Sequence, residues 1–176
     1  MTAQSFRTLP RGNRFVLAGQ ARLGLANGFG RTVQLTGPNG EIEAEVVDDL
    51  PASERFYGGG DTTVRGFALD TLGTPETIDK DGFPLGGNAI VIFNAELRAL
   101  VRGPISAVGF LDIGNVFRRA SDVRLGDLRS AVGFGLRYRS PVGPIRVDLG
   151  FKTHPEVVAG RQERLTALHI TLGQAF

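Results

Sequence analysis

The sequence contains no cysteine, no tryptophan, one methionine and two histidines. The absence of cysteine excludes disulfide bonds, thiolate zinc sites and cysteine nucleophiles. No stretch approaches the roughly 18 apolar residues of a membrane-spanning helix, so a helical membrane protein is excluded too. A membrane β-barrel is not excluded, because its strands carry only alternating apolar positions. The net charge is only +2, which argues against nucleic acid as a partner.

Glycine, by contrast, is abundant, at 25 of 176 residues. With many Val, Ile, Phe and Thr residues, this composition favours strands and tight turns over helices. A hydrophobic content of 41% argues against wholesale disorder, and the length suits one domain. Since no segment combines a helical period with helix caps, the chain is predicted to be all-β.

The strand prediction depends on period-two alternation. Between Ile145 and Lys152, every second residue is Ile, Val, Leu or Phe, and the residues between them are Arg, Asp, Gly and Lys. Comparable alternation predicts five further strands: Phe15–Leu25, Asn88–Val101, Ile105–Phe117, Ala131–Arg139 and Leu165–Phe176. Gln4–Leu9 is predicted to be the stub of another strand. Arg31–Thr36 and Glu41–Val47 flank an Asn-Gly turn and are predicted to form a hairpin.

The connections between these strands alternate in length. Arg102–Pro104 and Ser140–Pro144 are short, whereas Arg118–Ser130, Thr153–Glu163 and Asn27–Gly87 are long. Short turns at one end and long loops at the other are typical of an outer-membrane barrel. Charged residues of both signs fall on the less apolar faces, as expected for a polar lumen. A soluble β-sandwich or a lipocalin-like barrel would also show alternation, so the pattern alone leaves these folds open.

Five motifs in a fixed order add a family resemblance. They are residues 54–67, which end in Val-Arg-Gly-Phe, then Pro84–Asn88 with Asn94–Arg98, Phe110–Asn115, Gly133–Asp148, and the closing Leu172–Phe176. Together they resemble the BamA/TamA/FhaC superfamily of outer-membrane assembly and translocation barrels, of the bacterial surface antigen type. The resemblance covers roughly residues 10–176.

This resemblance implies an antiparallel transmembrane β-barrel in the bacterial outer membrane. Residues 1–176 would form a single barrel domain, whose six to eight strands resemble the C-terminal strands of a sixteen-stranded barrel. Residues 27–87 would be the long sixth extracellular loop, which folds back into the lumen. The implied function is assembly or insertion of outer-membrane proteins, with outer-membrane lipid and client β-barrel proteins as partners and without a cofactor.

The loop motif predicts a specific contact inside the lumen. By strand parity, Glu96 and Asp112 lie on the lumen faces of neighbouring strands, and a loop tip entering the lumen would place Arg65 between them. We name this predicted contact, which would hold the loop against the wall, the loop lock. Gly66 would allow close backbone approach, and Phe67 would pack against the wall. The motif residues in this prediction are Gly58, Gly59, Val64, Arg65, Gly66 and Phe67. Without the resemblance, Arg65 could equally be a solvated loop arginine.

The last strand is predicted to border the seam, where the first and last strands of a barrel of this family meet. Its predicted functional residues are Leu168, Ile170, Leu172, Gly173 and Phe176. The family's periplasmic POTRA domains and first nine or so strands have no counterpart in this sequence. We therefore expect either a piece of a longer protein or a short relative of the family. A short relative could close a barrel by itself, with the 31–47 hairpin bringing the strand count to eight, or several copies could close one larger barrel as a homo-oligomer. The alternative functions are a passive barrel pore and a FhaC-like translocation pore.

Signals for enzymatic chemistry are weak. His154 and His169 lack the spacing of metal ligands. Residues 58–63 are glycine-rich but lack the lysine and the following helix of a P-loop, and Asp79–Gly82 lacks the remaining ligands of a calcium loop. We therefore predict neither an enzyme nor a metal site.

Overall fold

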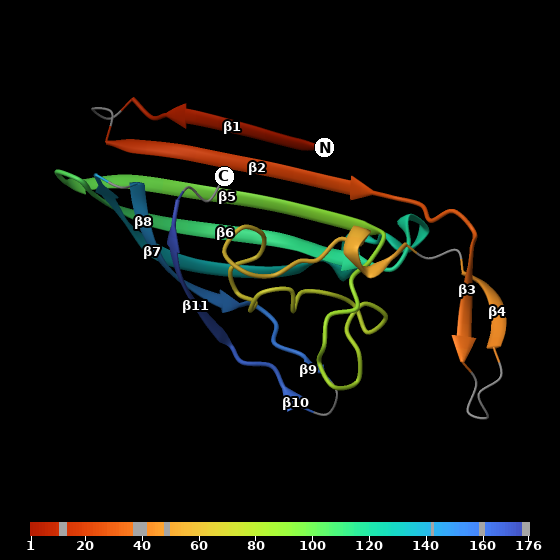
Figure 1. The fold of residues 1–176 in the computed structure, drawn as a ribbon. Coiled ribbons are helices and arrows are strands. Elements are labelled where there is room, and N and C mark those ends of the chain that lie inside the picture. The colour runs from red at the N-terminus through yellow and green to blue at the C-terminus, as the bar shows by residue number, and fades with distance from the viewer. Residues whose placement is uncertain (11–13, 37–41, 48–49, 142, 159–160, 174–176) are drawn as a thin grey trace.

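The computed structural model describes residues 1–10, 14–36, 42–47, 50–141, 143–158 and 161–173. Its main element is a seven-stranded sheet in which neighbouring strands are antiparallel (Figure 1). In sheet order the strands are β1 (Thr2–Thr8), β2 (Phe15–Leu25), β5 (Ala89–Arg102), β6 (Ile105–Phe117), β7 (Arg129–Ser140), β8 (Gly143–Lys152) and β11 (Thr166–Leu172). The all-β prediction is confirmed, and the predicted stub at the N-terminus is a full strand, β1.

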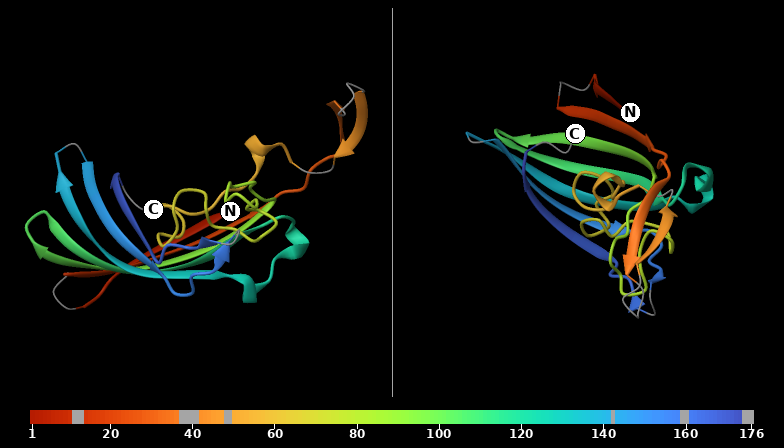
Figure 2. Two further views of the ribbon diagram at one scale, coloured as in Figure 1. Left: turned by 90° about the horizontal axis from the view of Figure 1, so that it is seen from below. Right: turned by 45° about the vertical axis from the view of Figure 1, so that its right-hand side comes forward.

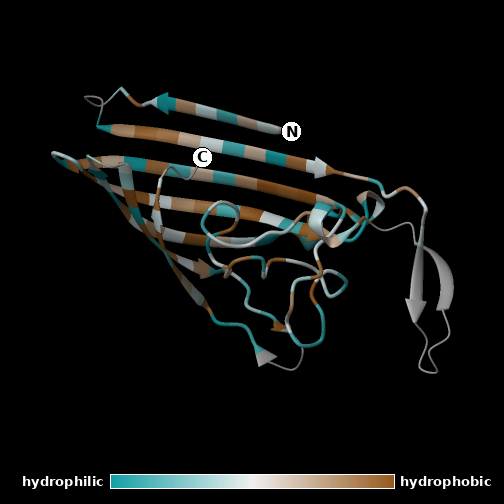
Figure 3. Ribbon diagram, viewed as in Figure 1, coloured by the Kyte–Doolittle hydropathy of each residue, from teal (hydrophilic) through white to brown (hydrophobic). Residues whose placement is uncertain are grey.

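The two faces of this sheet differ as the alternation predicts. Brown and teal segments alternate along the middle of β2 and β5 in Figure 3, whereas the long-loop end of β5 is continuously brown. The convex face exposes large apolar side chains, among them Leu17, Leu23, Phe93, Leu97, Leu111, Val132, Phe134, Leu136, Leu168 and Ile170. A continuous apolar surface of this kind is what the hydrocarbon of a membrane requires.

The concave face is covered by the chain between β4 and β5 (Figure 2). Near the long-loop end, Val64, Phe67 and Leu72 of this segment pack on Ile90, Ile92, Val116 and Ala131 of the sheet. Towards the middle of the strands the buried residues become polar and charged, and they include Glu96, Asp112 and Asp148. The luminal segment is therefore attached by an apolar cluster at one end and by charged groups deeper inside.

One alternative from the sequence is wrong. The predicted hairpin forms, as β3 (Arg31–Thr36) paired with β4 (Ile42–Val47), but it makes a separate two-stranded sheet. It projects away from the main sheet (Figures 1 and 2). Its predicted Asn-Gly turn lies outside the described residues. The hairpin cannot raise the strand count to eight, because β2 pairs with β5 along its full length and leaves no edge between them.

In their described residues, the remaining long connections contain only short elements. The 118–130 connection holds two 3-10 turns, η2 (Ala120–Asp122) and η3 (Leu125–Asp127), and the 153–163 connection holds β9 (Val157–Val158) and β10 (Arg161–Gln162). A further 3-10 turn, η1 (Ala52–Glu54), opens the luminal segment. Within the described ranges, no helix is long and apolar enough to cross a membrane.

Candidate functional site in the barrel lumen

The tip of the luminal segment is a compact turn that presents Arg65. Gly59 and Gly60 have φ angles of 107° and 94°, which side chains rarely adopt. A Cβ on Gly59 would lie 2.3 Å from the carbonyl oxygen of Ala68, so the turn closes too tightly for a larger residue. The N–H of Gly60 donates to the carbonyl of Phe67 at 3.0 Å and completes the turn. The tip is thus a defined structure that can position a side chain.

Arg65 is almost fully buried, with 1% of its surface exposed, and it donates hydrogen bonds to two carboxylates, while a third, Asp148, lies 3.7 Å from Nη1. Its Nε and Nη2 atoms donate to Asp112 Oδ2 and Oδ1 at 2.7 and 2.8 Å, and Nη1 donates to Glu96 Oε2 at 3.1 Å. The backbone N–H of Arg65 also donates to Asp112 Oδ2 at 3.1 Å. The fork of the guanidinium matches the carboxylate, which makes this a bidentate, charge-assisted pair.

The guanidinium of Arg65 also stacks on an aromatic ring. Its Cζ atom lies 3.6 Å from the ring centroid of Phe110 on β6. The ring fits because β7 has Gly133 at the adjacent position, where a Cβ would lie 2.3 Å from the ring. The guanidinium of Arg65 is therefore held by hydrogen bonds in its plane and by the Phe110 ring on its face. Both contacts depend on the planar shape of this cation.

A second layer of charges surrounds this pair. Asp112 Oδ1 also accepts from the amide of Asn94 at 2.8 Å. Glu96 pairs with Arg98 at 3.0 Å and with Arg137 at 3.3 Å, and Arg137 continues to Asp148. Each buried carboxylate thus has more than one partner, as a charged network in a low-dielectric interior requires. Burial acts to lower the pKa of Arg65, but the hydrogen bond to Asp112 and the charges of Asp112, Glu96 and Asp148 raise this pKa above its ordinary value.

Small residues let the loop backbone lie directly on the wall. A Cβ on Gly150 of β8 would lie 2.2 Å from the carbonyl oxygen of Arg65. A Cβ on Gly66 would lie 2.4 Å from the Cβ of Ala131 on β7. Phe67, which is 1% exposed, has the cations of Arg129 and Lys152 over its ring, at 4.7 and 4.6 Å from the centroid.

The loop tip also contacts the last strand. His169 Nε2 lies 3.0 Å from the carbonyl oxygen of Arg65, and Thr171 Oγ1 donates to Asp61 Oδ2 at 2.8 Å. Arg146 of β8 donates to the carbonyl of Asp61 at 3.0 Å. The same turn therefore contacts β5, β6, β8 and β11.

The structure places the other predicted site residues as follows. Val64 is fully buried in the apolar cluster, and Gly58 forms a bridge with Leu72 beneath it. On β11, Leu168, Ile170 and Leu172 are exposed, on the face opposite to His169 and Thr171. Gly173 has a φ of 120° and donates to Pro144. Phe176 lies outside the described residues.

Sequence reasoning missed several residues of this site: Phe110, Gly133, Arg137, Asp148, Gly150, His169 and Thr171. Gly133 and Gly150 stand at lumen-facing positions in the alternation, and this was the available signal for a close backbone approach. His169 could not have been assigned, because nothing in the sequence indicates which loop atom it contacts.

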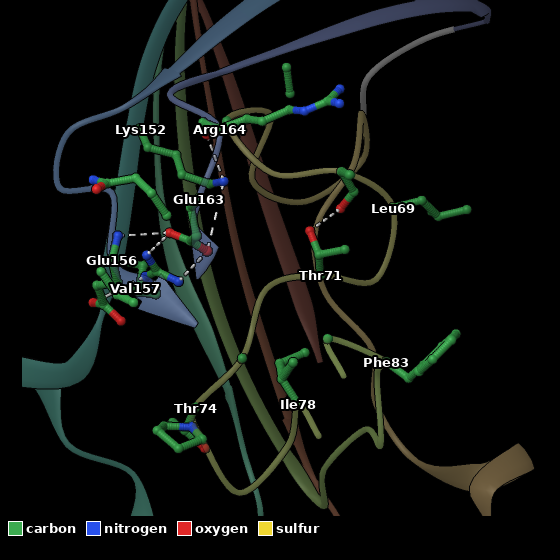
Figure 4. Close-up of a pocket in the computed structure, with 18 of the residues that line it drawn as sticks. Leu69, Thr71, Thr74, Ile78, Phe83, Lys152, Glu156, Val157, Glu163 and Arg164 are labelled. Carbon is green, nitrogen blue, oxygen red and sulfur yellow. Dashed lines mark hydrogen bonds and ion pairs between the residues drawn. The ribbon is translucent and has the colours of Figure 1, made fainter. Parts of the chain in front are cut away.

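Next to the loop lies a cavity of about 1300 Å³ (Figure 4). On one wall Arg129 pairs with Glu163 at 2.5 Å, and Lys152 lies 3.7 Å from the same carboxylate. Burial acts to raise the pKa of Glu163, but its hydrogen bonds and the charges of Arg129 and Lys152 lower it overall. Among the described residues, no group of three or more His, Cys, Asp or Glu side chains could hold a metal ion.

Comparisons with known proteins agree on one family. The Omp85 superfamily domain matches residues 1–176. The outer membrane protein assembly factor BamA of Nitratidesulfovibrio vulgaris is 31% identical over 58% of this chain, and that of Neisseria meningitidis is 27% identical over 84%. The chloroplastic outer envelope protein 80 of Arabidopsis thaliana is 30% identical over 77%.

A solved structure shows the same fold. The crystal structure of BamA from Haemophilus ducreyi lacking POTRA domains 1–3 covers 97% of this chain with a TM-score of 0.63, at 17% identity. This chain spans 34% of that structure, and it spans 13%, 17% and 21% of the three relatives. The family match, the relatives and the seven-stranded antiparallel sheet together show that the chain belongs to the Omp85 superfamily and corresponds to the C-terminal part of an outer-membrane β-barrel.

Proposed function

We propose that this chain is the part of an outer-membrane assembly barrel that presents the last strand to client proteins. The observation that carries the proposal is the position of β11. In the described part of the chain it pairs only with β8, while its lumen-facing residues contact the loop tip. A strand with one unpaired edge can pair with an incoming strand by β-augmentation. Two of the three relatives are named outer membrane protein assembly factors, which agrees with this role.

In this proposal the Arg65 contacts act as the loop lock. The buried bidentate pair with Asp112 fixes the tip, and the tip in turn positions β11 through His169 and Thr171. The lock does no covalent chemistry and needs no cofactor. It supplies a rigid inner support, so that the outer edge of β11 keeps one register.

Strand parity argues against the alternative of identical copies sharing one barrel. Every neighbouring pair in the sheet is antiparallel, so β1 and β11, at the two edges, run in the same direction. Copies related by rotation about the barrel axis would join β11 to a parallel β1. A closed barrel with only antiparallel neighbours needs an even number of strands. The rest of the barrel must therefore supply an odd number of strands in addition to these seven. This favours a different barrel segment over a passive homo-oligomeric pore.

The test is the folding of a client barrel into liposomes that contain the full-length protein. The wild type should accelerate client folding, R65A should reduce the acceleration, and R124A, at an exposed loop arginine, should not. Conductance measured on the same liposomes separates the alternatives. Ion conduction without any acceleration would refute the assembly proposal and support a passive pore.

A further inference from the structure

Charge is segregated along the length of the strands. All 18 acidic residues lie between positions 41 and 163. Those on the main strands are Glu96, Asp112 and Asp148 of the luminal network, and the others belong to the long connections and the 41–54 region. Residues 1–27, 97–111, 128–147 and 164–176 contain no Asp or Glu. These stretches supply the short-turn end of the sheet, drawn on the left in Figure 1.

That end carries exposed arginines instead. Arg7 is the last residue but one of β1, Arg14 precedes β2, Arg102 ends β5 and Arg139 is the last residue but one of β7. All four are exposed. We name this set the arginine rim. Among the described residues none of the four is in an ion pair, whereas Arg98 and Arg137, one layer deeper, pair with Glu96. The rim is therefore an uncompensated positive edge.

Two arginines of the rim, Arg7 and Arg102, continue the apolar outer face, whereas Arg14 and Arg139 stand at the strand ends on the other parity. In the strand register Arg7 is opposite Leu17, and Arg102 is opposite Ile105. Leu17 and Ile105 are 45% and 42% exposed, and Tyr138, opposite Ile105 on the next strand, is 45% exposed. Tyrosine is enriched where hydrocarbon meets headgroups, and arginine can bury its stem while its charge reaches the headgroups.

We propose that the arginine rim binds the phosphates of anionic phospholipids in the leaflet at the short-turn end. The guanidinium fork can take two phosphate oxygens, and a basic residue near an anionic surface changes affinity by about fivefold at low salt. The arginines are distributed over the ends of β1, β2, β5 and β7, along the curve of the wall. This arrangement fits a ring of lipid headgroups better than one acidic protein surface. The proposal stands whether or not the barrel is an assembly factor.

The experiment compares lipids bound at the surface of the full-length protein. Spin-labelled phosphatidylglycerol and spin-labelled phosphatidylcholine are incorporated in turn into phosphatidylcholine vesicles, and the relative association constant is obtained from the immobilised fraction. The wild type should prefer phosphatidylglycerol. R7Q/R102Q/R139Q should reduce that preference by at least tenfold, because three charges are removed. R118Q/R119Q/R124Q, a matched control at the loop end, should keep it.

Three results would overturn the proposal: no preference in the wild type, a preference that the triple rim variant retains, or an equal loss in the control. A salt titration of the wild type needs no variant to fold. Because headgroup binding by exposed cations is screened, the preference should disappear at high salt, and its persistence would also refute the proposal. A wild type that shows no preference for phosphatidylglycerol but binds an acidic protein would refute the proposal and show that the rim is a protein-binding surface.

Discussion

Replacement of Arg65 by alanine is the most direct perturbation of the lumen. The change removes the bidentate pair with Asp112, the bond to Glu96 and the stack on Phe110. Removing one partner of a buried ion pair costs about 3–5 kcal/mol, because the other charge stays buried. Asp112 would keep its bond from Asn94, and Glu96 would keep two arginines.

These remaining partners place the expected cost at the lower end, about 3 kcal/mol, or roughly a 150-fold loss in the folding equilibrium constant. R65K should cost less, because lysine keeps the charge but loses the fork and the stack. D112A should cost a similar amount to R65A. The double variant should fall short of the sum by about 2 kcal/mol, since the shared interaction can be lost only once.

The assay is urea unfolding of the protein in lipid vesicles, with limited proteolysis of residues 50–88 as a second readout. R124A, at an exposed loop arginine, should change the free energy of unfolding by less than about 0.5 kcal/mol. Full additivity of R65A and D112A would refute the argument that the two residues stabilise the loop through each other. Unchanged proteolysis in R65A would show that the apolar cluster alone holds the loop.

Three further predictions concern the surroundings of this contact. G150A should destabilise the protein by about 1–3 kcal/mol, because its Cβ would overlap the loop backbone, whereas G109A, with open space around it, should be nearly neutral in urea unfolding. T171V should speed amide hydrogen exchange in β11 about fivefold, since one hydrogen bond to the loop is lost. The folded-state pKa of Glu163 is lowered, so its pair with Arg129 stabilises the folded protein at pH values above about 4.3, the pKa of a free glutamate. This stabilisation is lost as the pH falls through the lowered pKa. Proteolysis of the 153–165 connection should therefore rise in acid, and E163Q should remove that dependence.

The sheet was largely predictable because strand alternation is a local property. Each strand of the wall has one face towards lipid and one towards the lumen, so period two is visible in the residues themselves. The N-terminal strand was underestimated, because every residue of β1 is exposed and no burial pattern marks it. The hairpin was correctly paired but wrongly offered as part of the wall, since its sequence does not say which edges are already occupied.

For the lumen, strand alternation was enough to assign Glu96 and Asp112 to one side of their strands, and the separation of acidic residues from the short-turn end is visible in the sequence alone. Three contacts became visible only in the folded chain: Arg65 stacks on Phe110, Gly150 admits the loop backbone, and His169 and Thr171 contact the tip. This difference follows from the range of the interactions. Strand parity is set by the pleat over neighbouring residues, whereas these contacts join residues 45 to 110 positions apart and depend on the path of the loop across the sheet.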